Sequence, residues 1–296
     1  MTEGRAMSAF CDDALGTADA VEVARRIEAG EISAREAVEA AIARADRVNP
    51  TLNAIAAMSF DEAREEAADR RSGALSGVPS FVKDTDPVEG LPMRFGSRGL
   101  PDEPAVETSR CAEQFLSTGL ISLGKTTTPE FGLTGTTEPL LHGPTHNPWK
   151  LGFSTGGSSG GSAAMVAAGV VPIAHANDGG GSTRIPAACC GLVGLKPSRG
   201  RLVHIEGAAL MPVKIVHQGM LSRSVRDTVA FYQAAEQYSR NLRLPEIGPI
   251  TRPGRRLRIG FFCEFGEGAQ SHPEGVAAVA TTAELCESLG HSVEPV

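Results

Sequence analysis

Apolar residues recur at helical spacing in several parts of the chain. Residues 18–29, "ADAVEVARRIEA", predict an amphipathic helix. The stretch "SARE" at 33–36 has the pattern of a capping box and opens a second helix, which we expect to reach about Val48 and to be stopped by Asn49 and Pro50. The same reasoning predicts further helices over residues 61–71, 109–118, 159–169 and 225–238.

Short apolar runs between these helices predict buried strands. Such runs lie at 77–84, where Phe81 and Val82 lead to Lys83, at 120–124 and at 170–176. The order of strands and helices is typical of the α/β class. We expect one domain over residues 1–296, made of these parts: N-terminal helices 18–71, a core 77–239, a linker 240–255 and a strand–helix–strand segment 257–296.

Composition and charge narrow the possible partners. The 296 residues are 41% hydrophobic and carry a net charge of −7, which disfavours a direct nucleic-acid surface. The N-terminus lacks an apolar signal core, and no apolar run is long enough for a membrane span. The six cysteines show no paired spacing, so reduced thiols and a cytoplasmic location are expected.

Two stretches of the chain match the consensus sequences of known functional motifs, whereas no stretch matches a metal site. "GLISLGKT" at 119–126 fits the phosphate loop with Lys125, but its apolar interior favours a strand. "GGSSG" at 156–160 fits the nucleophile elbow of an α/β-hydrolase esterase, with Ser158 as nucleophile, although no strand precedes it. Histidine and cysteine spacing predicts no metal site, and no cofactor is expected.

The stretch "NDGGGSTR" (177–184) puts three glycines directly before Ser182. If Ser182 attacks a carbonyl carbon, consecutive N–H groups of Gly179, Gly180, Gly181 and Ser182 can converge on the oxyanion, because glycines place no Cβ in the way. Losing one such donor typically costs about 10²–10³ in rate, which outweighs the cost of the glycines.

A serine nucleophile needs a base, and lysine replaces histidine in some hydrolases. Lys83 ends an apolar strand, and burial lowers a lysine pKa toward neutrality. If the lysine and the nucleophile do not touch, a hydroxyl must relay the proton, and either Ser158 or Ser159 is a candidate.

These residues resemble a known family. "GGSSGGSAA", "NDGGGSTRIPA", the upstream "VKD", "GKTTTPEFG", "HNPW" and "GLVGLKPSRGR" are similar to the amidase signature family. The resemblance implies a mixed central β-sheet with helices on both faces. Because members of that family normally continue well past this point, we also expect the chain to be truncated at its C-terminus.

The resemblance also implies a role for each matching residue. Ser182 is the implied nucleophile, Ser158 the relay after a cis peptide bond from Gly157, and Lys83 the base. The implied surroundings are these: Gly179, Gly180, Gly181 and Ser182 as oxyanion hole, Asp178 and Arg184 as braces of that loop, and Gly132 to Thr134 as pocket lining.

The implied activity is cleavage of a small-molecule amide through a seryl acyl-enzyme, without metal or cofactor. Asn177 stands where the family usually has threonine, a variant similar to the branch with the cyclic nylon-dimer hydrolases and related bacterial amidases. A nucleotide-binding module, an esterase, a transamidating subunit serving charged tRNA and an inactive fragment are the alternatives. A homodimer is the candidate assembly.

Overall fold

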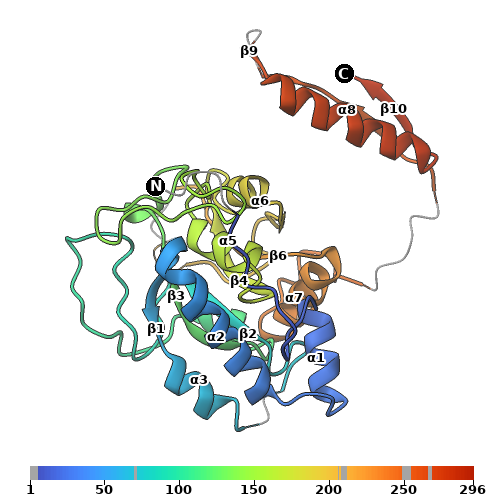
Figure 1. Cartoon of the computed structure of the whole chain (residues 1–296). Helices are drawn as coiled ribbons and strands as arrows, with labels where there is room; N and C mark the ends of the chain where they lie inside the picture. Colours follow the sequence, from blue (N-terminus) through green and yellow to red (C-terminus); the bar gives the residue numbers. More distant parts are fainter. Residues whose placement is uncertain (1–5, 70–71, 206, 208–211, 249–254, 266–268) are drawn as a thin grey trace. The chain divides into compact units, whose positions relative to one another are not determined.

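The computed structural model describes residues 6–69, 72–205, 207, 212–248, 255–265 and 269–296. The chain divides into two compact units, Met1–Ile247 and Gly248–Val296, which are described separately (Figure 1). The boundary falls inside the predicted linker, of which residues 249–254 lie outside the described residues. The prediction of one domain over the whole chain stays a prediction.

Two three-stranded sheets, ordered β1–β3–β2 and β4–β6–β5, form the centre of the first unit. Their strands are β1 (Ile55–Met58), β2 (Pro79–Lys83), β3 (Ile121–Thr126), β4 (Ile173–Asp178), β5 (Val193–Gly194) and β6 (His217–Ser222). β2 pairs with β3 in parallel, and the other pairs are antiparallel. Every residue of β2, β3, β4 and β6 is buried, so both faces of these strands are covered. The α/β class and the mixed strand directions are confirmed.

The two sheets meet where β2 lies beside β4 (Figure 1). The Ser80 hydroxyl donates to the carbonyl of Ile173 over 2.9 Å, and the Lys83 backbone N–H donates to His175 Nδ1 over 3.3 Å. Side-chain bonds therefore join the strands where a backbone ladder would run in one continuous sheet.

Helices cover these strands. They are α1 (Ala20–Glu28), α2 (Ala34–Leu52), α3 (Phe60–Glu66), α4 (Arg110–Leu116), the 3₁₀ helix η1 (Glu130–Gly132), α5 (Gly160–Ala167), α6 (Arg184–Cys190) and α7 (Val225–Tyr238). α2 contacts β2 and β3, α5 contacts β2, β4 and β6, and α7 contacts β6. Phe81, Phe115 and Phe231 are among the largest fully buried side chains of the core.

Helix α2 begins as the sequence predicts but ends later. Ser33 and Glu36 form the reciprocal capping box. The prediction that the helix stops at Asn49 and Pro50 was wrong, since the helix continues to Leu52. Pro50 lies in the last turn, and the end of the helix is closed by Asn49: its carbonyl accepts from the Asn53 N–H, and its side chain accepts from the next two N–H groups.

The second unit contains β7 (Arg258–Phe261), β8 (Glu264–Phe265), β9 (Ala269–Gln270), α8 (Pro273–Ser288) and β10 (Ser292–Pro295). β7 and β10 pair in parallel, and α8 contacts β10. These three elements lie in the segment 257–296, where the sequence predicts a strand, a helix and a strand. Among the described parts of both units, no helix has the length and apolar character needed to cross a bilayer.

Candidate active site

Lys83, the last residue of β2, is the centre of a buried polar cluster. Its side chain is fully buried, and its Nζ lies 2.7 Å from Ser158 Oγ and 2.7 Å from Asn177 Oδ1. Both partners are uncharged, so no carboxylate neutralises an ammonium at this position by direct contact. The amine is therefore placed to exchange a proton with the Ser158 hydroxyl.

Burial is the main influence on the charge of Lys83. It lowers the pKa of the amine from 10.5 to about 7, although the carboxylates of Asp86 and Asp178 oppose the shift. A lysine with this pKa is about half neutral at pH 7 and largely neutral one pH unit higher, and its neutral form has a lone pair available to accept a proton. A neutral amine can donate one N–H to Asn177 and still accept from Ser158.

Ser158 sits in a tight backbone setting. The peptide bond between Gly157 and Ser158 is cis, as the family resemblance implies. A Cβ added to Gly157 would lie 2.7 Å from the Thr136 carbonyl oxygen and 2.8 Å from that of Thr134, so only glycine fits. Gly132, with φ of +66°, packs against the hydroxyl, since a Cβ there would lie 3.3 Å from Ser158 Oγ.

The predicted pocket residues differ in their position relative to the cluster. Gly132 lies directly beside Ser158, whereas the Thr134 side chain is exposed and donates to the Thr136 carbonyl over 2.9 Å. The part of Thr134 that packs close to Gly157 is its backbone carbonyl oxygen. The role of both residues in substrate binding stays a prediction.

Ser182 lies next to this pair. The N–H of Ser159, which directly follows Ser158, donates to the Ser182 carbonyl over 3.2 Å. Ser182 is only half-buried, whereas Lys83 and Ser158 are buried. The structure thus joins Lys83 of β2 to Ser158, before α5, by their side chains, and it places the backbone of Ser182, between β4 and α6, beside Ser159. The catalytic role of Ser182 stays a prediction.

Asp178 organises the glycine loop that carries Ser182. Its carboxylate accepts from the Gly181 N–H over 2.8 Å and from two guanidinium nitrogens of Arg184, each over 2.9 Å. Burial alone would raise the pKa of Asp178, but these donors lower it below its ordinary value. The bracing role of Asp178 and Arg184 stays a prediction with which these contacts are compatible.

Gly181 needs a correction to its predicted role. Its N–H is directed to Asp178, so it is not available to an oxyanion. Gly181 is a glycine because its φ is +122° and an added Cβ would lie 2.8 Å from Ile185. Gly180 differs, because an added Cβ would meet nothing within 4 Å. The N–H groups of Gly179, Gly180 and Ser182 stay the candidate donors.

Three residues of the cluster are not predicted as site residues from the sequence. Asn177 contacts the Lys83 amine, its Nδ2 donates to Thr85 Oγ1 over 2.7 Å, and Thr85 donates to Asp86 over 2.9 Å. In the sequence, Asn177 stands out only as a departure from the family pattern. Thr85 and Asp86 follow Lys83 in "VKDTD", which is the one signal that points to them.

Lys125 has a different role from the one a phosphate loop would give it. Residues 121–126 form strand β3, and Lys125 is fully buried with its Nζ 2.8 Å from Asp84 Oδ1. A strand with this ion pair does not favour the nucleotide-binding alternative. The esterase alternative is not favoured either, since the partner of the Ser158 hydroxyl is Lys83.

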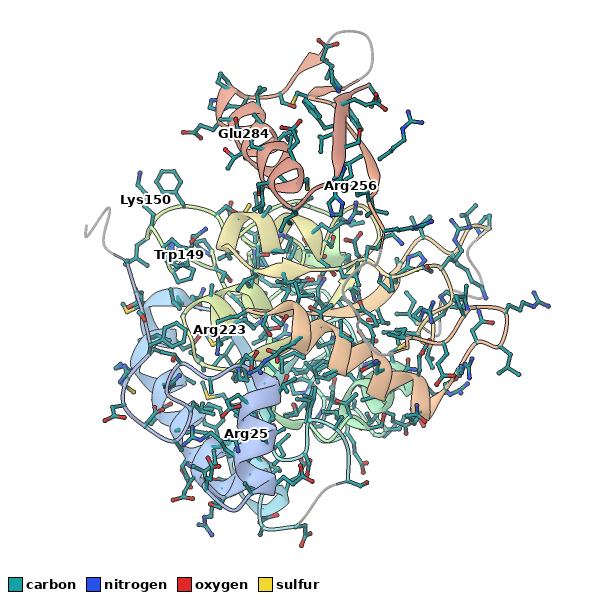
Figure 2. All side chains as sticks on the ribbon, turned by 90° about the vertical axis from the view of Figure 1, so that its right-hand side faces the viewer. Arg25, Trp149, Lys150, Arg223, Arg256 and Glu284 are labelled. Carbon is teal, nitrogen blue, oxygen red and sulfur yellow. The ribbon has the colours of Figure 1, made fainter. Side chains whose placement is uncertain are left out.

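The segment 142–157, which precedes Ser158, is held by side chains. Asn147 Nδ2 donates to the Cys189 carbonyl over 2.8 Å, and Trp149 Nε1 donates to the Cys190 carbonyl over 2.7 Å. Figure 2 shows Trp149 next to Lys150, whose side chain is exposed. Across the described ranges, no group of three or more His, Cys, Asp or Glu gathers to hold a metal.

Comparison with known proteins gives one family. The Amidase family model matches residues 36–296. The chain is 48% identical over 289 residues to the AmiC protein of Mycobacterium leprae, covering 97% of this chain and 62% of that protein. It is 38% identical over 302 residues to the 6-aminohexanoate-cyclic-dimer hydrolase of Paenarthrobacter ureafaciens, covering 93% of this chain and 58% of that protein.

A solved structure agrees with these relatives. A bacterial aryl acylamidase superposes with a TM-score of 0.84 at 31% identity, covering 94% of this chain and 61% of that chain. The chain thus spans about three fifths of the length of the proteins it matches.

Proposed function

The chain belongs to the amidase family, and from this membership we propose that it hydrolyses a carboxylic amide through Ser182, Ser158 and Lys83. The observation that carries the proposal is the 2.7 Å contact between the buried Lys83 amine and the Ser158 hydroxyl. A buried lysine that contacts a serine, rather than a carboxylate, is arranged for proton transfer.

In the first half of the reaction, Ser182 Oγ attacks the carbonyl carbon of the amide. Its proton passes to Ser158 Oγ, while the Ser158 proton passes to the neutral Lys83 amine. The oxyanion of the tetrahedral intermediate accepts from the N–H groups of Gly179, Gly180 and Ser182. The C–N bond then breaks, and the leaving nitrogen takes a proton back from Lys83 through Ser158.

In the second half, water attacks the acyl group on Ser182. The water proton travels along the same relay to Lys83. Protonated Lys83 then returns a proton through Ser158 to the Ser182 oxygen as the carboxylic acid leaves. No net proton is gained or lost by the relay over both halves. Each step uses a serine hydroxyl or a lysine amine as acid or base, which is the chemistry a lysine pKa near 7 serves.

We propose an apolar acyl group for the substrate. The side chains of Phe131, Leu133 and Ile185 are exposed to solvent at 47%, 81% and 38%. Phe131 and Leu133 flank Gly132 beside Ser158, and Ile185 packs on Gly181 beside Ser182. Apolar surface so close to the reacting groups favours an apolar acyl chain. Relatives named for acylamidase and cyclic-dimer hydrolase activity are compatible with such substrates.

The test is release of p-nitroaniline from acetyl, butyryl and benzoyl p-nitroanilides. Ser182→Ala is expected to lower turnover by on the order of 10⁵-fold, and the exposed Ser198→Ala variant to leave it unchanged. Labelling with a fluorophosphonate followed by peptide mapping should place the label on Ser182. Wild-type turnover by the folded Ser182→Ala variant would rule out the mechanism, and a label on Ser158 would favour the esterase alternative.

Location and assembly belong to the same proposal. All six cysteines lie among the described residues and none is in a disulfide, which is compatible with a reducing cytoplasm. We propose a cytoplasmic enzyme, with the homodimer as the assembly to be checked by sedimentation.

A further inference from the structure

A closed circuit of buried hydrogen bonds surrounds Lys83, and it has one carboxylate, that of Asp86. The members are Asp86, Thr85, Asn177, Lys83, His175 and Gln218, all buried. Two arms leave the Asp86 carboxylate, and both end on Lys83: one on its side-chain amine, the other on its backbone N–H.

The first arm fixes what the amine can do. A carboxylate only accepts, so the Thr85 hydroxyl must donate to Asp86 Oδ2, over 2.9 Å. The Thr85 oxygen is then left to accept from Asn177 Nδ2, over 2.7 Å. This turns Asn177 Oδ1 toward Lys83, which must donate one N–H to it over 2.7 Å. One N–H of a neutral amine is thereby committed to Asn177, which leaves its lone pair free to accept from the Ser158 hydroxyl, 2.7 Å away.

The second arm fixes the backbone of Lys83 in the same way. Gln218 Nε2 donates to Asp86 Oδ1 over 3.1 Å, so Gln218 Oε1 faces His175 Nε2, 3.0 Å away. His175 Nε2 must therefore carry the proton, and Nδ1 accepts from the Lys83 N–H over 3.3 Å. Burial lowers the pKa of His175, in keeping with this neutral tautomer.

We propose that Asp86 is the positioning residue for the catalytic base: its carboxylate sets the direction of every hydrogen bond in both arms and so orients the Lys83 amine toward Ser158. This inference rests on the proposed function, in which Lys83 is the base. Asp86 touches no reacting atom, and it acts through Thr85, Asn177, Gln218 and His175.

Several charged groups lie around Lys83 on the neighbouring elements. On the loop after β2 are Asp86 and Asp84, and Asp84 is paired with Lys125 of β3. On β4 are the neutral His175 and, at its end, Asp178, which is paired with Arg184. The Asp86 and Asp178 carboxylates both favour the charged form of Lys83. Asp86 is thus expected to affect the charge of the Lys83 amine as well as its orientation toward Ser158.

The first experiment uses Asp86→Asn with the surface variant Glu89→Gln as its control, because Glu89 is an exposed carboxylate on the same loop. Removing the buried charge should lower the Lys83 titration midpoint by about one unit. The acid limb of the kcat/KM profile should move to lower pH by the same amount. The plateau of kcat/KM should fall by on the order of tenfold or more, since the amine is no longer oriented. Glu89→Gln should change neither.

The midpoint can be read without turnover. The chain has five lysines, so isotopic labelling of the lysine Cε gives few NMR signals, and Lys83→Met identifies the one that belongs to Lys83. If the wild type shows no Ser182-dependent hydrolysis, the proposed function fails while this titration still tests the influence of Asp86 on Lys83. An unchanged midpoint and unchanged kcat/KM in Asp86→Asn overturn the inference.

A swap tests the orienting role separately, and it also serves if Asp86→Asn does not fold. The swap variant combines Asp86→Asn with Gln218→Glu. Its new amide donates to the new carboxylate, which still accepts from His175, while the oxygen of that amide still accepts from Thr85. Every bond toward Lys83 keeps its direction. Recovery of the plateau kcat/KM to within about threefold of wild type supports the proposal, and a folded swap variant as slow as Asp86→Asn contradicts it.

Discussion

Two lysines on neighbouring strands are equally buried but have opposite surroundings. Lys83 of β2 and Lys125 of β3 lie one register step apart, with Val82 opposite Lys125, and neither side chain is exposed to solvent. Lys83 contacts a serine hydroxyl and an amide oxygen, whereas Lys125 lies 2.8 Å from the Asp84 carboxylate. Lys150, by contrast, is exposed to solvent (Figure 2).

The difference shows that the partner, and not burial alone, decides what a buried lysine does. Burial lowers the pKa of both amines, but at Lys125 the Asp84 carboxylate opposes the shift by charge and by hydrogen bond. Lys125 also donates to the Pro92 carbonyl over 3.3 Å. Lys125 therefore braces the loop after β2, while Lys83 is left to exchange protons.

The largest effect is expected for Lys83→Met. Turnover should fall by on the order of 10⁴-fold or more, because the relay loses its proton acceptor. The free energy of unfolding at pH 7 should not decrease, since methionine fills the site without a buried amine. Assays of p-nitroanilide hydrolysis and thermal unfolding on the same preparation test both parts. A variant that keeps a tenth of wild-type turnover contradicts the role of Lys83.

The opposite result is expected for Lys125→Met. Removing one partner of a buried ion pair typically costs about 3–5 kcal/mol, because the other charge is left without a partner. Denaturant unfolding measures this loss, and the folded variant should keep turnover within about tenfold. The double variant Lys125→Met with Asp84→Asn is the matched control and should recover part of the stability. Equal stability of wild type and Lys125→Met would mean that the pair braces nothing.

The sequence predicts the role of Lys83 but not the partner of Lys125. Lys83 is identified from an apolar strand, a glycine-rich loop and the family resemblance. The motif around Lys125 matches a phosphate loop, but its apolar interior predicts the strand that the structure has, and no local pattern marks Asp84 as the partner of Lys125. A residue's neighbour in the next strand, and the direction of its side chain, depend on a register that a single sequence does not state.

Strand β6 is missed and helix α7 is predicted, for reasons that lie in their local sequences. Strand β6, His217–Ser222, is not predicted because its buried sequence "HQGMLS" has neither the apolar run of the other buried strands nor an alternation of apolar and polar residues. Its Gln218 is polar and buried because it completes the circuit around Lys83. By contrast, helix α7 is predicted with its observed bounds, Val225–Tyr238, because its signals are local.

Asn177→Asp would give Lys83 the kind of partner that Lys125 has. The wild-type rate should fall about tenfold per pH unit below a pKa of about 7, where Lys83 is protonated. A carboxylate within hydrogen-bond distance raises a lysine pKa by roughly 1–3 units, so the acid side of the pH–rate profile should move to higher pH in the variant. At pH 7, where half of the wild-type Lys83 is neutral, the variant should be about 5- to 500-fold slower and recover as the pH rises. A loss that is the same at every pH contradicts this reasoning.

The most gradual effect is expected on the pH dependence of stability. The pKa of Lys83 is about 7 when folded and near 10.5 when exposed, so between these values the unfolded chain binds more protons. Stability contributed by this site should therefore rise with pH across that window, by at most about 1.4 kcal/mol per unit, and stay constant below it. The difference in unfolding free energy between wild type and Lys83→Met isolates the slope, because other titrating groups cancel. A flat difference across the window between the two pKa values would mean that Lys83 remains charged in the folded protein and, like Lys125, serves as a brace.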